Sequence, residues 1–523
     1  MTTVEDPAAA AKDRPAGRAS VRVLLIPLVL AMMLSQLDNM IVGTAMPTVT
    51  AELGGLEHVA WVVTAYTLAT AVSTPVWGRL GDTRDRKKVL LTAITVFLVG
   101  SGLSGAAQDM GQLIAFRAVQ GLGAGGLMAG VMATVGELVP PRERGRYQGL
   151  ISGAMALAMI GGPLAGGAVT DHLGWRWAFY LNLPLGALAL VMIWLLLRLP
   201  ERRSTARVDH VGAALLMVGI TATVLLTTWG GTRYAWGSGA VAALGVTAGV
   251  SLWAFVRRQL RTADPIMPPH MFRVRNFTLM SVIGFLTGFV LFGALLFLPL
   301  YQQAVQGASA TNSGLLLLPM LAAMIVTSLV AGRVTTVSGR YKVFPVAGGA
   351  LLCAGTWLLS RMDTSTSRPA AALYMAVLGA GLGCLTQIVT VVAQNSVELR
   401  DIGAASAAVT LFRTLGSCFG VAVMGTLFNR EVLRVMAERA PGRPALENAQ
   451  LDAASLARLE PALHEAYRHA TAAGTHAAFV LSAVVGGAVC VAGLLVREVA
   501  LRRAAQGDLS HERPTRPRAP GSR

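Results

Sequence analysis

Long apolar runs separated by short polar connections repeat along almost the whole chain. Each run has about the 20 residues that an α-helix needs to cross a bilayer. We therefore expect an all-α integral membrane protein with fourteen transmembrane helices, over residues 23–47, 59–80, 89–108, 111–135, 148–170, 177–198, 210–229, 238–256, 276–301, 312–333, 343–361, 370–395, 403–428 and 475–497.

Three segments fall outside this pattern. Residues 1–20 are charged and rich in alanine and proline, so we expect a disordered cytoplasmic N-terminus, and residues 501–523 form a basic cytoplasmic tail. Residues 429–474 are polar with a helical pattern in one part, and we expect them on the extracytoplasmic side. They are either a surface spacer or a segment that handles substrate or docks a partner.

Internal repeats divide the chain into two halves. Gly78-Arg79 recurs 254 residues later as Gly332-Arg333, and Gly121 and Gly123 recur 258 residues later at Gly379 and Gly381. The repeats predict two pseudo-symmetric six-helix halves, 21–200 and 263–500, with two inserted helices in 201–262. Paired halves with a binding site between them are the architecture of alternating-access transporters.

The charge pattern predicts how the helices are oriented. Only 14% of the residues are charged and 54% are hydrophobic, yet the net charge is +17. Lysine and arginine cluster in one set of loops, whereas the opposite loops 48–58 and 304–311 contain none, so the basic set and both termini are predicted to be cytoplasmic. The clusters form no continuous stripe with interleaved aromatic residues, so we expect no nucleic-acid partner.

Asp38 is the strongest candidate for chemistry. A carboxylate deep in a membrane helix costs about 2.5–3.5 kcal/mol, so it should have a partner or a function. Arg117 enters the fourth predicted helix from the outer side at a depth that permits contact with Asp38. The two form either a structural buried ion pair or a proton-coupling site.

Three further sets of residues are candidates. The loop residues Gly78, Asp82 and Arg86 predict a gate in which Asp82 caps the helix that starts near 401–404, unless the loop is only a positive-inside cluster. Small residues with one proline indicate a packing site or a hinge in the fifth helix: Gly162, Pro163, Gly166 and Gly167. Polar residues of the second half are either structural or form a cavity wall: Gln387, Gln394 and Arg413.

The sequence shows no motif for metal binding, phosphate binding or catalysis. The four cysteines lie inside apolar runs without metal-ligand spacing, and no phosphate-binding loop or nucleophile–base constellation stands out. We therefore expect no enzyme activity, no metal and no cofactor, with a proton gradient as the energy source. The expected partners at this point are the lipid bilayer and protons, and we expect a monomer.

Five short motifs carry a family resemblance: residues 37–47, the loop 78–88, Arg117 with Gln120, Gly121 and Gly123, Gly162-Pro163 with Gly166-Gly167, and Trp175-Arg176-Trp177 followed by Asn182. Together they resemble the major facilitator superfamily, specifically its fourteen-helix drug:proton antiporters. The resemblance implies multidrug efflux from a bacterial inner membrane, with Asp38 and Arg117 linked to protons and Gly78, Asp82 and Arg86 forming a gate.

The sequence says less about the substrate than about the class of transporter. Asp38 is the only acid deep in a predicted span, so we expect monocationic or neutral hydrophobic substrates. A dedicated exporter of an endogenous antibiotic, lipid, siderophore or amino acid is the first alternative. A non-transporting receptor that binds through 429–474 is a more remote one.

Overall fold

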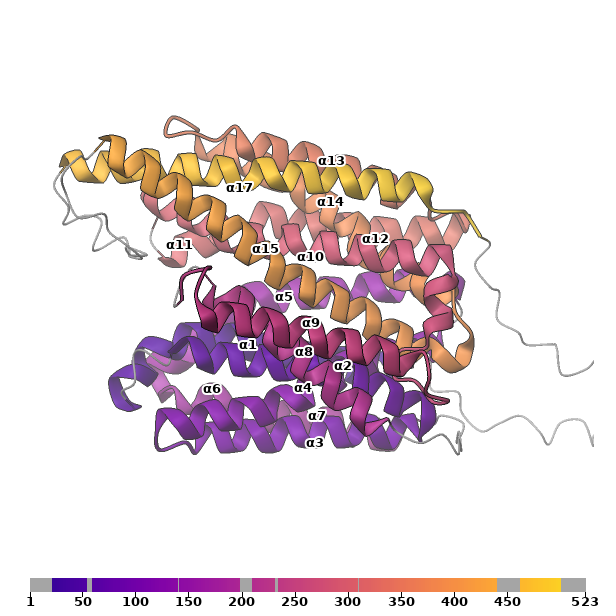
Figure 1. Ribbon diagram of the computed structural model, residues 1–523. Coiled ribbons are helices and arrows are strands. Elements are labelled where there is room, and N and C mark those ends of the chain that lie inside the picture. Colours follow the sequence, from indigo (N-terminus) through magenta and orange to yellow (C-terminus); the bar gives the residue numbers. More distant parts are fainter. Residues whose placement is uncertain are drawn as a thin grey trace, which may run out of the picture.

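The computed structural model is a bundle of long helices that lie side by side (Figure 1). It describes residues 21–53, 59–139, 141–197, 209–230, 234–308, 310–439 and 461–499. The helices within these ranges are α1 (Val21–Leu53), α2 (Val59–Thr83), α3 (Arg86–Gly105), α4 (Met110–Leu138), α5 (Pro141–Leu173), α6 (Arg176–Tyr180), α7 (Asn182–Leu196), α8 (His210–Trp229), α9 (Gly239–Gln259), η3 (Pro269–Arg273), α10 (Arg275–Ala304), α11 (Ala310–Leu315), α12 (Leu318–Ser338), α13 (Val343–Ser360), α14 (Arg368–Asn395), η4 (Leu399–Asp401), α15 (Ile402–Arg439) and α17 (Pro461–Leu495).

Twelve stretches of the described residues are long and apolar enough to cross a membrane. The helices α2 and α5 are not among the twelve but run within the same bundle, where α2 packs on α4 and α5 packs on α1. The all-helical membrane fold predicted from the sequence is confirmed. The predicted number of fourteen spans is confirmed for twelve.

The helix contacts repeat between the two halves of the chain. In the first half α2 packs on α4, α3 on α4 and α1 on α5; in the second half α12 packs on α14, α13 on α14 and α10 on α15. The halves meet through α2 with α15 and through α5 with α12, which is again one contact and its symmetric copy. This pattern is the three-dimensional counterpart of the glycine repeats in the sequence.

Side-chain caps fix several helix starts. Asp85 accepts hydrogen bonds from the backbone N–H groups of Lys87 and Lys88, and Asp109 accepts one from Gln112 N, so α3 and α4 begin directly after these aspartates. At the other end of a helix, Gly339 has φ +71° and terminates α12, in a conformation that glycine adopts at little cost.

Two helix boundaries differ from the sequence prediction. The helix predicted to end at 428 continues as α15 to Arg439, and α17 begins at Pro461 instead of 475. Residues 429–439 and 461–474 are therefore extensions of two helices and not parts of a separate segment. The charges that suggested a polar loop pair along the helix, since Arg434 donates to Glu431 and Glu438. Residues 440–460 and the tails 1–20 and 501–523 lie outside the described residues.

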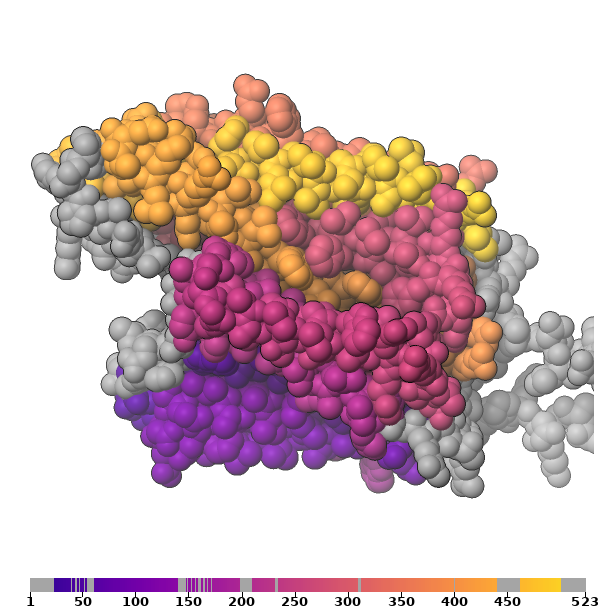
Figure 2. Space-filling model, viewed as in Figure 1, coloured from indigo at the N-terminus to yellow at the C-terminus, as the bar shows by residue number. Residues whose placement is uncertain are grey.

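The inserted helices α8 and α9 lie on one side of the seam between the halves. Figure 2 shows them as a magenta ridge between the violet first half and the orange and yellow second half. Of the two, α8 packs on both α2 and α15, which come from different halves. The insertion predicted at 201–262 thus covers a boundary and does not interrupt either half.

Gly123→Val is expected to destabilise the first half by at least about 1–3 kcal/mol, because α4 packs against α3 without space for a side chain. A Cβ at Gly123 would lie 2.6 Å from Phe97 Cα and 2.8 Å from Ala93 O. The measurement is the yield of monodisperse protein and its melting temperature in detergent. Gly249→Ala, where an added Cβ meets nothing within 4 Å, is the control. Equal losses in both variants would contradict this account of the packing.

Candidate functional site

A polar cluster is buried inside the first half, between α1, α4 and α7. Asp38 and Arg117 are both fully buried, and Arg117 Nη1 lies 2.5 Å from Asp38 Oδ2. The other carboxylate oxygen of Asp38 accepts hydrogen bonds from Gln120 Nε2 at 2.9 Å and Asn182 Nδ2 at 2.7 Å. The contact predicted between Asp38 and Arg117 is present, and the two amides add hydrogen bonds that stabilise the buried Asp38 carboxylate.

Four residues around this pair, Asn182, Ser101, Tyr66 and Ser35, were not identified as its partners from the sequence. Asn182 also donates to Ser101 Oγ at 2.9 Å, which links the cluster to α3. The ring of Tyr66 lies 4.1 Å from the Arg117 guanidinium carbon, and its hydroxyl lies 2.8 Å from Ser35 Oγ. Single hydroxyl and amide residues in apolar runs give a weak signal, because such groups often bond only to their own helix.

The glycines of the fourth-helix motif bring α4 close to its neighbours. A Cβ at Gly121 would lie 2.9 Å from the Cβ of Ala69 on α2, and Gly123 faces α3 as described above. Gly162 of α5 is packed against Met40 of α1, two residues from Asp38, and Gly166 is buried. The packing of Pro163 and Gly167 lies outside what the structure describes.

One end of the bundle is closed by Asp82. This end carries the α2–α3 connection with Arg84 to Lys88 and is called the basic end below. Asp82 Oδ1 accepts a hydrogen bond from Gly403 N at 2.9 Å and Oδ2 accepts one from Ala404 N at 2.7 Å. As predicted, Asp82 therefore binds the N-terminus of a second-half helix, α15, where the helix dipole favours a negative charge.

Two neighbours complete this contact. A Cβ at Gly78 would lie 2.6 Å from Ala407 Cβ, so α2 and α15 touch almost backbone to backbone. Arg86 forms ion pairs with Asp82 at 2.5 Å and with Glu137 of α4 at 2.8 Å. Glu137 was not identified from the sequence. The three predicted gate residues therefore lie together at the junction of the two halves.

Gln394 strengthens the closed end, and neither Gln394 nor Gln387 is among the residues that line the cavity described below. Gln394 Nε2 donates to Met132 O of the first half at 3.1 Å and to Ser406 Oγ at 2.9 Å. Gln387 accepts a hydrogen bond from Ser328 Oγ at 3.0 Å and lies 3.0 Å from the position of a Cβ on Gly149 of α5. The sequence predicted a cavity wall from these glutamines and Arg413, and of the three only Arg413 lines the cavity.

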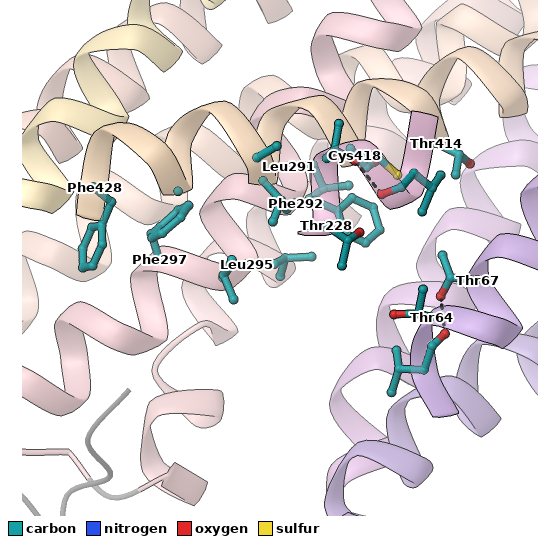
Figure 3. A pocket seen from close by; sticks show the side chains of 18 of the residues that line it. Thr64, Thr67, Thr228, Leu291, Phe292, Leu295, Phe297, Thr414, Cys418 and Phe428 are labelled. Atoms are coloured by element: carbon teal, nitrogen blue, oxygen red, sulfur yellow. Dashed lines mark hydrogen bonds between the residues drawn. The ribbon is translucent and has the colours of Figure 1, made fainter. Parts of the chain in front are cut away.

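The cavity lies between the two halves and has a volume of about 1740 Å³. Its wall begins at Thr74 on α2 and Thr410 on α15, just beyond the contacts of Asp82, and reaches exposed residues Trp236 and Arg430 at the opposite end. Figure 3 shows Phe292, Phe297 and Phe428 on one side and Thr64 and Thr67 of α2 on the other. The cavity is closed at the basic end and open at the opposite one.

The Asp38 cluster lies directly behind this wall. Ser35 and Tyr66 line the cavity and are hydrogen-bonded to each other, and the Tyr66 ring covers the guanidinium of Arg117. Asp38 itself is not part of the lining. Ser35 of α1, Tyr66 of α2 and Arg117 of α4 thus connect Asp38 with the cavity wall.

Comparison with known proteins shows which family has this architecture of two halves around a cavity. The sequence profile of the Major Facilitator Superfamily matches residues 28–421. The chain belongs to this superfamily. It is 40% identical over 406 residues to the "Uncharacterized MFS-type transporter Rv1877" of Mycobacterium tuberculosis, covering 78% of this chain but only 59% of that protein. It is 34% identical over 442 residues to the "Multidrug transporter protein MdtP" of Bacillus subtilis, covering 84% and 81% of the two chains.

Solved structures agree on the fold of this superfamily member. The human organic anion transporter MFSD10 superposes with a TM-score of 0.62 over 91% of this chain and 99% of that one, at 14% sequence identity. A similarity at this identity concerns the fold alone. The Asp38 cluster, the Asp82 contact and the cavity are features of the present chain.

Proposed function

We propose that this chain is a proton-coupled exporter of hydrophobic small molecules that works by alternating access in a bacterial inner membrane, with both termini in the cytoplasm. The observation that carries the proposal is the buried Asp38–Arg117 pair behind the wall of a large cavity between the halves. Protonation of Asp38 would leave the buried Arg117 without its counter-charge. This loss would change the stability of the contact between α1 and α4.

Conformation and orientation support export. The basic end is cytoplasmic by the positive-inside rule, so the Asp82 contact closes the cytoplasmic side and the cavity faces outward. An exporter adopts this form when it releases substrate and can accept a proton from outside. The name of the Bacillus subtilis relative, "Multidrug transporter protein MdtP", supports drug-like small molecules as substrates.

The substrate charge is a separate part of the proposal. The sequence predicted monocationic or neutral substrates. Among the described residues, those that line the cavity include no aspartate or glutamate and three arginines, Arg413, Arg430 and Arg434. This wall favours neutral over monocationic substrates, since no lining residue offers a negative charge.

The proposal is tested with the full chain in proteoliposomes under an imposed pH gradient, with ethidium, Nile red and dansyl-leucine as substrates. We expect gradient-driven transport of at least one of them, with proton movement in the opposite direction, and loss of both with a protonophore. Transport that persists with the protonophore, or the absence of gradient-driven transport of all three, would overturn the proposal.

A further inference from the structure

Arg413 occupies an unusual position in the cavity wall. It lies eleven residues after the start of α15 at Ile402, roughly 16 Å from the basic end and therefore deep in the membrane. Among the described residues its guanidinium has no hydrogen bond or ion pair, although it lines the cavity. A cation at this depth is costly and is expected to mark a substrate or ion pathway when no protein group compensates it.

The other two arginines of the wall are in a different situation. Arg434 is ion-paired with Glu431 and Glu438, and Arg430 is exposed near the open end. Asp38 cannot compensate Arg413, because it lies outside the lining and both of its oxygens are occupied within the first half. The deep part of the cavity therefore carries one uncompensated positive charge.

Close packing between α10 and α15 holds Arg413 in place. A Cβ at Gly288 would lie 3.1 Å from Arg413 Cγ. The Cγ of Arg413 therefore packs directly against the backbone of α10 at Gly288, which has no side chain. A Cβ at Gly416 would lie 2.7 Å from the backbone carbon of Phe285, which shows the same close approach one turn later. Because these contacts fix the backbone and the Cγ of Arg413, fewer of its rotatable bonds remain for a ligand to order.

Neighbouring hydroxyls do not replace the guanidinium as donors. Thr410, Thr414 and Ser417 line the cavity beside Arg413, but each donates its hydroxyl hydrogen to a carbonyl oxygen one turn earlier in α15. They present acceptor oxygens to the cavity. In this part of the wall Arg413 is thus the group that can donate charge-assisted hydrogen bonds to a ligand.

The remaining wall is suited to an apolar body. Leu291, Phe292, Leu295 and Phe297 of α10 continue from the level of Cys418 toward the open end, as Figure 3 shows. Small-molecule sites commonly combine such apolar and aromatic lining with a few placed polar groups. A ligand that uses both features has a hydrophobic body and one anionic group.

We propose that the cavity binds and exports amphiphilic organic anions, with a carboxylate or sulfonate at Arg413 and the apolar body along α10. This inference rests on the proposed export function and names its substrate class. Export of an anion from a negative interior is driven by the membrane potential, by about fiftyfold per 100 mV for each charge. Exchange of one proton for one anion moves two charges, whereas exchange for a monocation moves none.

The test uses three dansyl-leucine derivatives that share one fluorophore: the free acid as an anion, the methyl ester as a neutral ligand and a dimethylaminoethyl amide as a cation. Binding to the purified full chain is followed by dansyl fluorescence. We expect the anion to bind best. Arg413→Gln should weaken its binding by about tenfold or more and leave the ester within about threefold, while Arg413→Lys retains most of the affinity. Arg361→Gln, an exposed arginine outside the cavity, is the matched control.

Several results would overturn the inference. These are preference of the wild type for the cation, equal weakening of anion and ester by Arg413→Gln, and displacement of the anion by phosphatidylglycerol, which would make the ligand a lipid headgroup. If Arg413→Gln fails to fold, the ranking of the three ligands on the wild type decides. Transport under a valinomycin-set potential separates the two proposals: anion binding without proton coupling defeats only the proposed function, and proton-driven export of the cation defeats only this inference.

Discussion

Asp38→Asn is expected to lower transport driven by a pH gradient by about a hundredfold or more, because the residue can no longer exchange a proton. The amide has nearly the same shape as the carboxylate, so the ligand cavity, from which Asp38 is absent, should keep its affinity. The measurement compares gradient-driven transport with substrate-for-substrate exchange in proteoliposomes. Exchange should continue while gradient-driven transport is lost.

Stability is the main complication of this experiment. Asp38→Asn leaves Arg117 buried without a counter-charge, and breaking a buried ion pair costs about 3–5 kcal/mol. The double variant Asp38→Asn/Arg117→Gln removes both charges and should regain stability without regaining coupling. Asp109→Asn is the matched control, since Asp109 is an exposed cap of α4 and asparagine caps equally well. Full gradient-driven transport by the double variant would show that the pair is only structural.

The sequence alone predicted the features that depend on a physical demand placed on single residues or on one run of residues. Apolar runs predicted the membrane helices. The glycine repeats predicted the paired halves, because two helices in close contact leave no room for a large side chain between them. Asp38 could be found because a charge in an apolar run is costly. Even the partner of Asp82 followed from the rule that carboxylates favour helix N-termini.

Other parts of the site depend on how the halves meet, which no local pattern contains. Gln387, Gln394 and Arg413 are all polar residues in apolar runs, yet Gln394 joins the two halves at the closed end, Gln387 bonds to α12 within its own half, and Arg413 lines the cavity. Glu137 gave no signal because its partner Arg86 is 51 residues away in the sequence. The length of α15 was underestimated because charges that pair within a helix resemble a polar loop.

Asp82→Asn is expected to shift the chain from the outward-open form toward a form that opens at the basic end. The substitution removes the charge that binds Gly403 N and Ala404 N across the junction and that pairs with Arg86 within the first half. Truncating one partner of a buried charged contact costs about 2–5 kcal/mol, and a loss of only about 2 kcal/mol changes a two-state ratio by roughly thirtyfold. The folded halves should persist, because Arg86 keeps its ion pair with Glu137 inside the first half.

Cys418 reports this shift, since it lines the cavity and is partly exposed. In a background with Cys353, Cys384 and Cys490 replaced by alanine, a membrane-impermeant thiol reagent should label Cys418 from outside in the wild type. In Asp82→Asn the outside labelling should fall and labelling from the cytoplasmic side should rise. Asp85→Asn, three residues away, should have little effect, because its ion pair with Lys88 is exposed and asparagine preserves the cap of α3. Equal labelling of the wild type and Asp82→Asn from both sides would show that the Asp82 contact does not control access to the cavity.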